Sequence, residues 1–355
     1  MIMAGGIGSR FWPLSTSDRP KQFIDILGIG KTLLQLTFER FNRIMPSENF
    51  YVVTSEKYKD LVMEQLPELD ASQILLEPLR RNTAPCIAYA TYKILSICPT
   101  AKIVVSPSDH LILKEDLFLN EIEKGLQFAG EKEVLVTLGI QPSRPETGYG
   151  YIQVSEKIDY DHYNNLYKVK TFTEKPDRAM AQVFVDTGEF YWNSGIFVWS
   201  VPSIQKAFEK YLPDLNMLFD HGKKLLNTPD ERFYINKTYS ECPNISIDYG
   251  IMEKAENVYV LTADFGWSDL GTWGSLYENH PLDTMGNAVY GSRVFLYDTE
   301  GCIINLPQEK IAVIQGLKDY IVVESQNILL ICKKEEEQQI RQYVADVMLS
   351  KETKI

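Results

Sequence analysis

The residues best suited to chemistry stand at the start of the chain, in a glycine-rich loop followed by two cations. The loop is Gly5-Gly6-Ile7-Gly8-Ser9-Arg10, and Lys21 follows eleven positions after Arg10. Because glycine lacks a Cβ, the backbone amides of such a loop approach a ligand closely and can cradle phosphates. Arginine offers a planar fork and lysine a mobile point charge, which are complementary ways of holding a triphosphate. Taken alone, the loop is better interpreted as a tight turn with surface cations.

Two familiar phosphate-binding motifs are excluded by single residues. The dinucleotide-binding fingerprint requires a third glycine, but Phe11 stands at that position. The segment Gly30-Lys31-Thr32 looks like the end of a P-loop, but Asp25 occupies the position of its earlier glycine. We therefore interpret this segment as a turn and a helix cap.

Two aspartates are candidates for holding a metal ion. Asp109 follows the apolar run Ile103–Val105, so it should lie at the carboxyl end of a strand, where α/β folds bind ligands. Asp269 is distant in sequence but lies in the equally loop-like segment Gly266–Gly271. Two carboxylates with few protein co-ligands suit Mg²⁺, which keeps several waters and takes phosphate oxygens as its other ligands. From these residues alone, a helix or turn cap is the simpler interpretation of Asp109.

The elements that would position these residues alternate between short β-rich runs and longer helical patterns. Buried strands are predicted at Phe50–Val53, Ile103–Val105 and Val134–Val136, and helices at Thr32–Ile44 and Ala84–Cys98. Residues that can cap the two helices are present at Thr32 and at Asn82 or Thr83. This alternation predicts an α/β fold with a Rossmann-like, mixed but mostly parallel sheet flanked by helices.

Three stretches depart from this alternation. Only Met1–Ala4 precede the glycine loop, so the first strand is unusually short or a few native N-terminal residues are missing. From about Gly139 to Trp199 the sequence alternates as strands rich in aromatic residues, which we interpret as an insertion or a lobe beside the sheet. After Gly286, short strands predict a small β-rich domain, at Arg293–Tyr297, Ile311–Ile314 and Tyr320–Val323.

The last segment is predicted to be a helix over Glu335–Leu349, with Glu335–Glu337 as its solvated start. We therefore expect a larger domain over residues 1–285 and a small β-rich, helix-terminated domain over residues 286–355.

The composition limits the possible functions. With 355 residues and 45% hydrophobic positions, the chain can bury a large core. No apolar run approaches the roughly 20 residues that cross a bilayer, and no signal peptide is apparent, so a cytoplasmic protein without a membrane partner is expected. The five scattered cysteines argue against a disulfide framework or a zinc site. The net charge of −12 argues against nucleic acid as a partner.

The residues that follow the N-terminal glycine loop make its functional interpretation more specific. Ala4-Gly5-Gly6-x-Gly8-x-Arg10 with Pro20-Lys21-Gln22-Phe23 resembles the signature of sugar nucleotidylyltransferases, and Phe11–Ser15 resembles their mannose-1-phosphate guanylyltransferase branch. Eight further segments resemble family motifs in family order: Glu77-Pro78, Arg81–Pro85, Pro107–His110, Gly148–Ile152, Thr173–Pro176, Trp192–Phe197, Ser246–Tyr249 and Gly266–Asp269. Two positions depart from the family pattern: Ile7 stands where a small residue, often serine, is common, and Thr16 stands where many members carry arginine.

The resemblance implies a fold and a reaction. The fold is that of nucleotide-diphospho-sugar transferases, in a short form without an isomerase domain. Its small β-helix-like C-terminal domain often helps to form dimers, so a homodimer is expected. The reaction is the transfer of GMP from GTP to α-D-mannose 1-phosphate, which gives GDP-mannose and pyrophosphate.

The resemblance also assigns site residues. Asp109 and Asp269 hold Mg²⁺ and act in catalysis with Arg10 and Lys21. Nucleotide contacts are implied for Gly5, Gly6, Gly8, Ser9, Arg10, Lys21, Asn82, Thr83 and Ser108. Sugar phosphate contacts are implied for Tyr149, Gly150, Glu174, Lys175 and Asn193, with Glu174 on the hexose and Lys175 on its phosphate.

Alternatives remain for the sugar site and for the activity. In an extended segment, Glu174 and Lys175 point to opposite faces, so a bend at Pro176 or a glycine-lined pocket is required to bring both to one ligand. Otherwise they form an exposed ion pair, which contributes little. The rival functions are transfer to another sugar 1-phosphate, such as glucose or heptose, or from another nucleotide, and an inactive regulatory subunit that binds nucleotide sugars.

Overall fold

The computed structural model describes residues 1–6, 8–160 and 163–352, without the side chains of Ser9 and of residues 350–352. Ile7 therefore lies outside the described residues. The chain forms two compact units. The first comprises Met1–Gly5, Thr37–Ser108 and Ile112–Trp267, and the second comprises Gly6–Leu36, Asp109–Leu111 and Ser268–Ile355.

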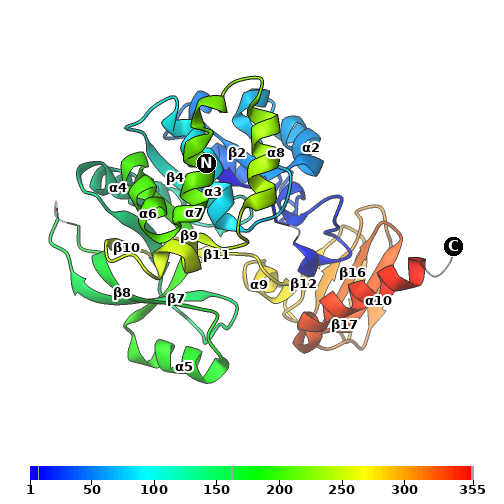
Figure 1. Ribbon diagram of the computed structural model, residues 1–355. Coiled ribbons are helices and arrows are strands. Elements are labelled where there is room, and N and C mark those ends of the chain that lie inside the picture. The colour runs from blue at the N-terminus through cyan, green and yellow to red at the C-terminus, as the bar shows by residue number, and fades with distance from the viewer. Residues whose placement is uncertain (7, 161–162, 353–355) are drawn as a thin grey trace. The chain divides into compact units, whose positions relative to one another are not determined.

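The first unit is built on a nine-stranded sheet in the order β3-β2-β1-β4-β9-β6-β10-β8-β7 (Figure 1). The strands of this sheet are β1 (Ile2–Met3), β2 (Val52–Ser55), β3 (Ile74–Glu77), β4 (Lys102–Pro107), β6 (Leu135–Ile140), β7 (Gly150–Lys157), β8 (Leu166–Glu174), β9 (Phe190–Ser200) and β10 (Val258–Thr262). The first four strands in this order are mutually parallel, and β10 is parallel to β6. The α/β fold with a mixed sheet is therefore confirmed.

The antiparallel pairs arise from the segment that the sequence places in a separate lobe. Strand β9 lies between β4 and β6 and is antiparallel to both, while β7 and β8 complete the same sheet at its end. The prediction of a lobe beside the sheet over Gly139–Trp199 is thus wrong. Alternating apolar residues identify strands, but they do not say which neighbour each strand pairs with.

Helices cover this sheet, and two of them, α1 and α3, correspond to the two helices predicted at Thr32–Ile44 and Ala84–Cys98. They are α1 (Leu33–Asn42), α2 (Lys59–Gln65), α3 (Thr83–Leu95), α4 (Glu115–Glu131), α5 (Arg178–Thr187), α6 (Val201–Tyr211), α7 (Pro213–His221) and α8 (Glu231–Glu241). Thr32 and Gln35 cap the start of α1 through reciprocal bonds from backbone to side chain. Asn82 caps α3, because its side-chain oxygen accepts the N–H of Thr83.

The second unit contains a coil of short parallel strands. Strands β12 (Ala288–Tyr290), β14 (Ile303–Asn305) and β16 (Tyr320–Ser325) pair in parallel, and β13 (Val294–Tyr297) pairs in parallel with β15 (Ala312–Gln315). Strand β17 (Ile328–Lys333) closes the first of these sheets in antiparallel fashion. Parallel pairing of successive short strands is the arrangement of a β-helix, so the β-helix-like C-terminal fold is confirmed.

The last helix starts later than predicted. Lys334–Gln339 form a 3₁₀ turn, and α10 spans Ile340–Glu352, alongside β16 and β17 in Figure 1. The run Glu335–Glu337 begins a helical turn as predicted, with Glu335 and Glu336 exposed, although the α-helix itself starts only at Ile340. The carboxylate of Glu337 instead accepts the backbone N–H of Gly274, at 2.8 Å, near the start of α9 (Trp273–Glu278). A carboxylate at the positive end of a helix is favourable, so Glu337 supports α9.

One apolar core joins the N-terminal and C-terminal segments of the second unit. Phe11 and Trp12 pack in the same cluster as Trp273 of α9, Ile321 of β16 and Ile340 of α10. The short strands β5 (Leu111–Ile112) and β11 (Trp267–Ser268) lie where the chain passes from one unit to the other. Among the described residues, no helix is long and apolar enough to cross a membrane.

Candidate active site

A cavity of about 280 Å³ in the second unit brings together five of the predicted site residues. Its lining includes Gly8, Arg10, Lys21, Asp109 and Asp269. The remaining lining residues are Phe11, His110, Gly271 and Arg341. Segments from the start, the middle and the end of the chain thus supply one cavity with both aspartates and three strong cations.

Lys21 connects the segments that line this cavity through three contacts of its ammonium group. It is only 4% exposed, and its ammonium lies 2.8 Å from the Asp109 carboxylate. The same group donates to the carbonyl oxygens of Asp269, at 2.7 Å, and Leu270, at 3.0 Å. These three acceptors match the three hydrogens of an ammonium group. Lys21 therefore fixes the loop of Asp109 against the loop of Asp269.

The Asp109 carboxyl is held in its ionised form. Burial alone would raise its pKa, but the positive charge of Lys21 and the adjacent His110 more than offset burial, so the pKa lies below its ordinary value. Nε2 of His110 lies 3.9 Å from Oδ1 of Asp109. An ionised carboxylate that faces a cavity is a suitable ligand for a hard divalent cation.

The backbone around Asp269 sets the direction of its side chain. Its Oδ1 accepts the N–H of Gly271 at 2.8 Å, and a Cβ at Gly271 would lie 2.6 Å from Oδ2. Leu270 has a positive φ of 42°, and its N–H donates to the Ser268 hydroxyl. Only glycine fits at position 271 without displacing the carboxylate.

The glycine loop is anchored through its carbonyl groups. Gln22 donates to the carbonyl of Gly6 at 2.9 Å, and the Ser15 hydroxyl donates to that of Gly8 at 2.8 Å. Gly8 has a φ of 58°, and a Cβ there would lie 2.6 Å from the Cβ of Lys21. Gly5 lies in the first unit, where a Cβ would approach the Glu77 carboxylate to 3.2 Å. The side chain of Ser9 lies outside the described part of the chain.

The predicted sugar residues form a separate group in the first unit. Gly150 of β7 pairs with Glu174 of β8, and a Cβ at Gly150 would lie 2.4 Å from Oε1 of Glu174. Lys175 has a φ of 47°, and its ammonium lies 3.1 Å from the Glu174 carboxylate. The chain therefore bends at Lys175, one residue before the expected Pro176, and this bend brings the two side chains together.

Asn193 of β9 is held in place on both sides of its amide. Its oxygen accepts from the Thr137 hydroxyl at 3.2 Å and from the N–H of Gly195 at 3.1 Å, and its nitrogen donates to Asp248 at 3.0 Å. Burial and the nearby Glu174 raise the pKa of Asp248 to about 7, despite the amide of Asn193 and the charge of Lys175. Asp248 was not predicted as a site residue, but it lies in the family motif Ser246–Tyr249, and that motif is the signal that could have identified it.

An aromatic group adjoins these residues. The Tyr149 ring meets the rings of Trp192 and Trp267 edge-on, at 5.1 and 5.2 Å between centroids. Its carbonyl accepts the N–H of Lys175 at 3.1 Å. Tyr149 therefore supports the bend at Lys175 through its backbone, while its side chain packs among aromatic rings.

Three further residues expected to contact the nucleotide, Asn82, Thr83 and Ser108, lie at the start of α3 and after β4, in the first unit. Asn82 has a φ of 66°, and the Thr83 hydroxyl accepts the N–H of Ile247 at 2.9 Å. Ser108 is buried, and its N–H donates to the carbonyl of Met3. None of Asn82, Thr83 and Ser108 lines the cavity that contains Asp109 and Asp269.

Comparison with known proteins identifies the chain. Residues 1–285 match the Nucleotidyl transferase family, and residues 282–347 match the MannoseP isomerase/GMP-like beta-helix domain. This chain belongs to the nucleotidyl transferase family. A relative from Escherichia coli, named mannose-1-phosphate guanylyltransferase, is 36% identical over 353 residues, which are 97% of this chain and 72% of the relative.

Other relatives agree with this assignment. The Klebsiella pneumoniae protein of the same name is 35% identical and covers 97% of this chain and 72% of its own length. A solved structure from Thermus thermophilus, described as a mannose-1-phosphate geranyltransferase, has a TM-score of 0.87 at 31% identity and covers 98% of both chains. The resemblance inferred from the sequence motifs is thereby confirmed.

The residues present fit a divalent cation, which nucleotidyl transferases of this family generally use. Two aspartates line one cavity, and Asp109 is held ionised. Among the described residues, no group of three or more histidines, cysteines and carboxylates could enclose a metal ion. A cation with only two protein ligands must complete its shell with water and phosphate oxygens, as Mg²⁺ does.

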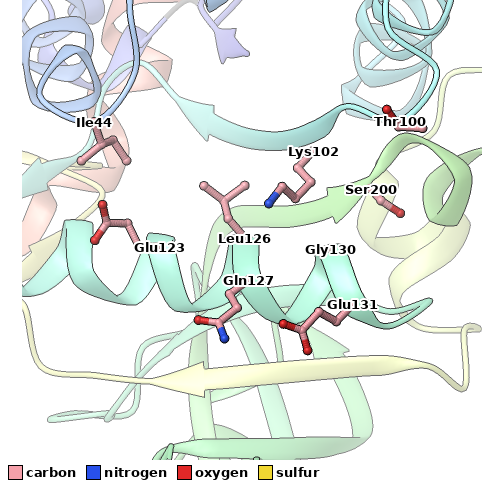
Figure 2. A pocket seen from close by; sticks show the side chains of 9 residues that line it. All are labelled: Ile44, Thr100, Lys102, Glu123, Leu126, Gln127, Gly130, Glu131 and Ser200. Atoms are coloured by element: carbon pink, nitrogen blue, oxygen red, sulfur yellow. The ribbon is translucent and has the colours of Figure 1, made fainter. Parts of the chain in front are cut away.

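Cavity size alone does not identify this site. A larger cavity, of about 510 Å³, lies in the first unit beside α4, where Lys102 of β4 reaches over Gly130 (Figure 2). Its other lining residues include Glu123, Leu126 and Gln127. None of the predicted site residues lines this cavity.

Two titratable residues that line the cavity were not among the predicted site residues. His110 belongs to the family motif Pro107–His110 but was assigned no role of its own. Arg341 lies on α10, and nothing in the periodicity of that helix distinguishes it from an ordinary surface arginine. Glu77 is also notable, because burial raises the pKa of its carboxyl to about 7 beside Gly5.

Proposed function

We propose that this nucleotidyl transferase transfers GMP from GTP to α-D-mannose 1-phosphate and releases GDP-mannose and pyrophosphate. The observation that carries the proposal is the identity of 36% over 97% of the chain with a mannose-1-phosphate guanylyltransferase. The gathering of Arg10, Lys21, Asp109 and Asp269 around one cavity supports it.

The chemistry requires little acid or base catalysis. An oxygen of the sugar phosphate attacks the α-phosphorus of GTP in line, and pyrophosphate leaves. The attacking group is already anionic near neutral pH, since the second pKa of a phosphate monoester is about 6. The barrier is mainly repulsion between anions and their alignment, which positive groups and fixed positions reduce.

Asp109 and Asp269 are proposed to hold Mg²⁺. When bound, Mg²⁺ would neutralise phosphate charge and fix phosphate oxygens in position. Lys21 would keep the two aspartate loops together, and the open space beside Gly6 would leave the loop amides accessible to phosphates. Arg10 would pair with the triphosphate through its planar guanidinium.

The other groups are proposed to select the substrates. Glu174 and Asn193 would bind hexose hydroxyls beside Gly150, and Lys175 would bind the sugar phosphate. The segment Arg81–Pro85, with Asn82 and Thr83, would contact guanine, because guanine offers an O6 acceptor and N1 and N2 donors that a polar loop can pair. Ser108 is the remaining proposed nucleotide contact.

The test is pyrophosphate release by the purified protein with Mg²⁺, across a panel of nucleoside triphosphates and sugar 1-phosphates. We expect the highest kcat/KM with GTP and mannose 1-phosphate. A preference for glucose or heptose 1-phosphate, or for another triphosphate, would overturn the substrate assignment. No product from any pair would favour a regulatory, nucleotide-sugar-binding protein.

Three further proposals concern organisation. We propose two domains, over residues 1–285 and 286–355, a homodimer, and a cytoplasmic location. Light scattering of the purified protein tests the dimer, and a mass of one chain would contradict it.

A further inference from the structure

The cavity lined by Asp109 and Asp269, here called the aspartate cavity, contains cations that differ in how many hydrogen-bond partners they already have. Lys21 already has the Asp109 carboxylate and two backbone carbonyls as acceptors. The Nε of Arg10, by contrast, is buried without a hydrogen-bond partner in the described part of the chain. A buried polar group that lacks a partner costs free energy, and an anionic ligand would supply that partner.

A second guanidinium lines the same cavity. Arg341 comes from α10, and the positive charge of Arg10 nearby lowers its pKa. Neither Arg10 nor Arg341 forms an ion pair with another described residue. Two like charges face one cavity without a carboxylate partner of their own, which is the arrangement expected before an anion binds between them.

The core fixes where Arg341 lies. Ile340, its neighbour in sequence, is 1% exposed and packs in the cluster that contains Phe11 and Trp273. Tyr343, Val344 and Val347 pack against the same cluster from α10. Because Phe11 directly follows Arg10, the core that seats α10 also holds the Arg10 backbone. The two guanidiniums are therefore placed by one set of apolar contacts.

The charges indicate which ligand suits the pair. The negative charge of Asp109 balances the positive charge of Lys21. The other charged groups of the lining include the guanidiniums of Arg10 and Arg341 and the carboxylate of Asp269, so positive charge is in excess. Arginine forks match phosphate oxygens through paired hydrogen bonds, and two forks match two linked phosphates better than one. A diphosphate group is therefore the fitting ligand, either as the end of a nucleoside triphosphate or as free pyrophosphate.

We propose that Arg341 on the C-terminal helix acts with Arg10 to bind the diphosphate that leaves in the reaction, so that the C-terminal segment completes the active site. This inference rests on the proposed function for its role in turnover. Binding of a diphosphate by the pair can be measured without turnover.

The decisive measurement is calorimetric titration of inorganic pyrophosphate, with Mg²⁺, into the wild-type protein and Arg341→Ala. A charge-assisted hydrogen bond lost from such a site corresponds to about tenfold or more in affinity. We expect that loss in Arg341→Ala, partial recovery in Arg341→Lys, and no change in Lys318→Ala. Lys318 is 71% exposed in the same unit, so its variant controls for the loss of one positive charge.

Steady-state kinetics separate a binding role from a structural one. Arg341→Ala should raise the KM for GTP, and for pyrophosphate in the reverse reaction, about tenfold or more, and leave the KM for mannose 1-phosphate unchanged. An equal rise for both forward substrates would indicate a general distortion and would overturn the proposal. Should Arg341→Ala melt well below the wild type, Arg341→Gln, which keeps part of the aliphatic stem but not the charge, provides the same test.

The outcomes distinguish this proposal from the proposed function. If the wild type formed no nucleotide sugar but bound pyrophosphate more tightly than Arg341→Ala, the function would fail and the arginine pair would stand. If turnover were normal and Arg341→Ala bound both pyrophosphate and GTP like the wild type, the role of Arg341 would be overturned alone.

Discussion

The ammonium of Lys21 lies 2.8 Å from the carboxylate of Asp109, although 88 positions separate the two residues in sequence (109 − 21). Lys21 is buried, whereas the Asp109 side chain keeps 30% of its surface exposed toward solvent. Lys21 therefore holds the ionised Asp109 carboxylate at the surface of the cavity. Loss of this ion pair should affect both the stability of the protein and its turnover.

We predict that Lys21→Met destabilises the protein by about 3 kcal/mol and abolishes turnover, because it leaves Asp109 without its buried partner. Urea unfolding and pyrophosphate release measure the two effects. Lys114→Met is the matched control, since its pair with Asp264 is exposed and should contribute less than about 1 kcal/mol. Equal effects of the two substitutions would contradict the central position of Lys21.

Asp109→Asn and Asp269→Asn should each abolish Mg²⁺-dependent turnover while leaving the fold intact, because an amide is a much poorer ligand for a hard divalent cation. Removal of divalent ions from the wild type with EDTA should have the same effect, reversed by added Mg²⁺. Circular dichroism checks the fold. Retained activity in either variant would remove that residue from the metal site.

Lys175→Ala should raise the KM for mannose 1-phosphate about tenfold and leave the KM for GTP unchanged, since the proposed charged hydrogen bond from Lys175 to the sugar phosphate is lost. Lys170→Ala, a change of an exposed lysine on the same strand, is the control. A rise in the KM for GTP alone would place Lys175 at the nucleotide instead.

Asp248→Asn should flatten the dependence of stability on pH. The folded-state pKa of Asp248 is raised to about 7, whereas an unfolded aspartate titrates near its ordinary value, 3.8. The folded wild type therefore binds more protons between these values, and its stability should fall as pH rises from about 4 to about 7. The asparagine variant carries no such titration. Unfolding midpoints at pH 5 and pH 7.5 provide the measurement, and identical slopes for the two proteins would contradict the raised pKa.

Local sequence signals located much of the fold and part of the site. The apolar run before Asp109 forms the buried strand β4. Asp109 lies just after the carboxyl end of this strand, where α/β sheets bind ligands. Thr32 and Asn82 cap helices as their side chains predict. In each case the information lies within a few residues of the position concerned.

The errors concern long-range partners. The strand pattern over Phe190–Ser200 was visible, but its insertion between β4 and β6 depends on residues far away in sequence. Lys175 takes a positive φ that its residue type disfavours, so the expected alternatives were a bend at Pro176 or a glycine-lined pocket, and not a bend at Lys175 itself. Arg341 could not be distinguished from other exposed arginines, because its cavity is assembled from loops that only the folded core brings together.

The shared packing of Phe11, Trp12 and Ile340 has a consequence for synthesis on the ribosome. The glycine loop is synthesised well before the apolar partners that seat its neighbours, because Ile340 lies 329 positions after Phe11 (340 − 11). A nascent chain can therefore form its large sheet and still lack the complete aspartate cavity until α10 has left the exit tunnel. Protease resistance around Phe11 should accordingly develop only after α10 has emerged.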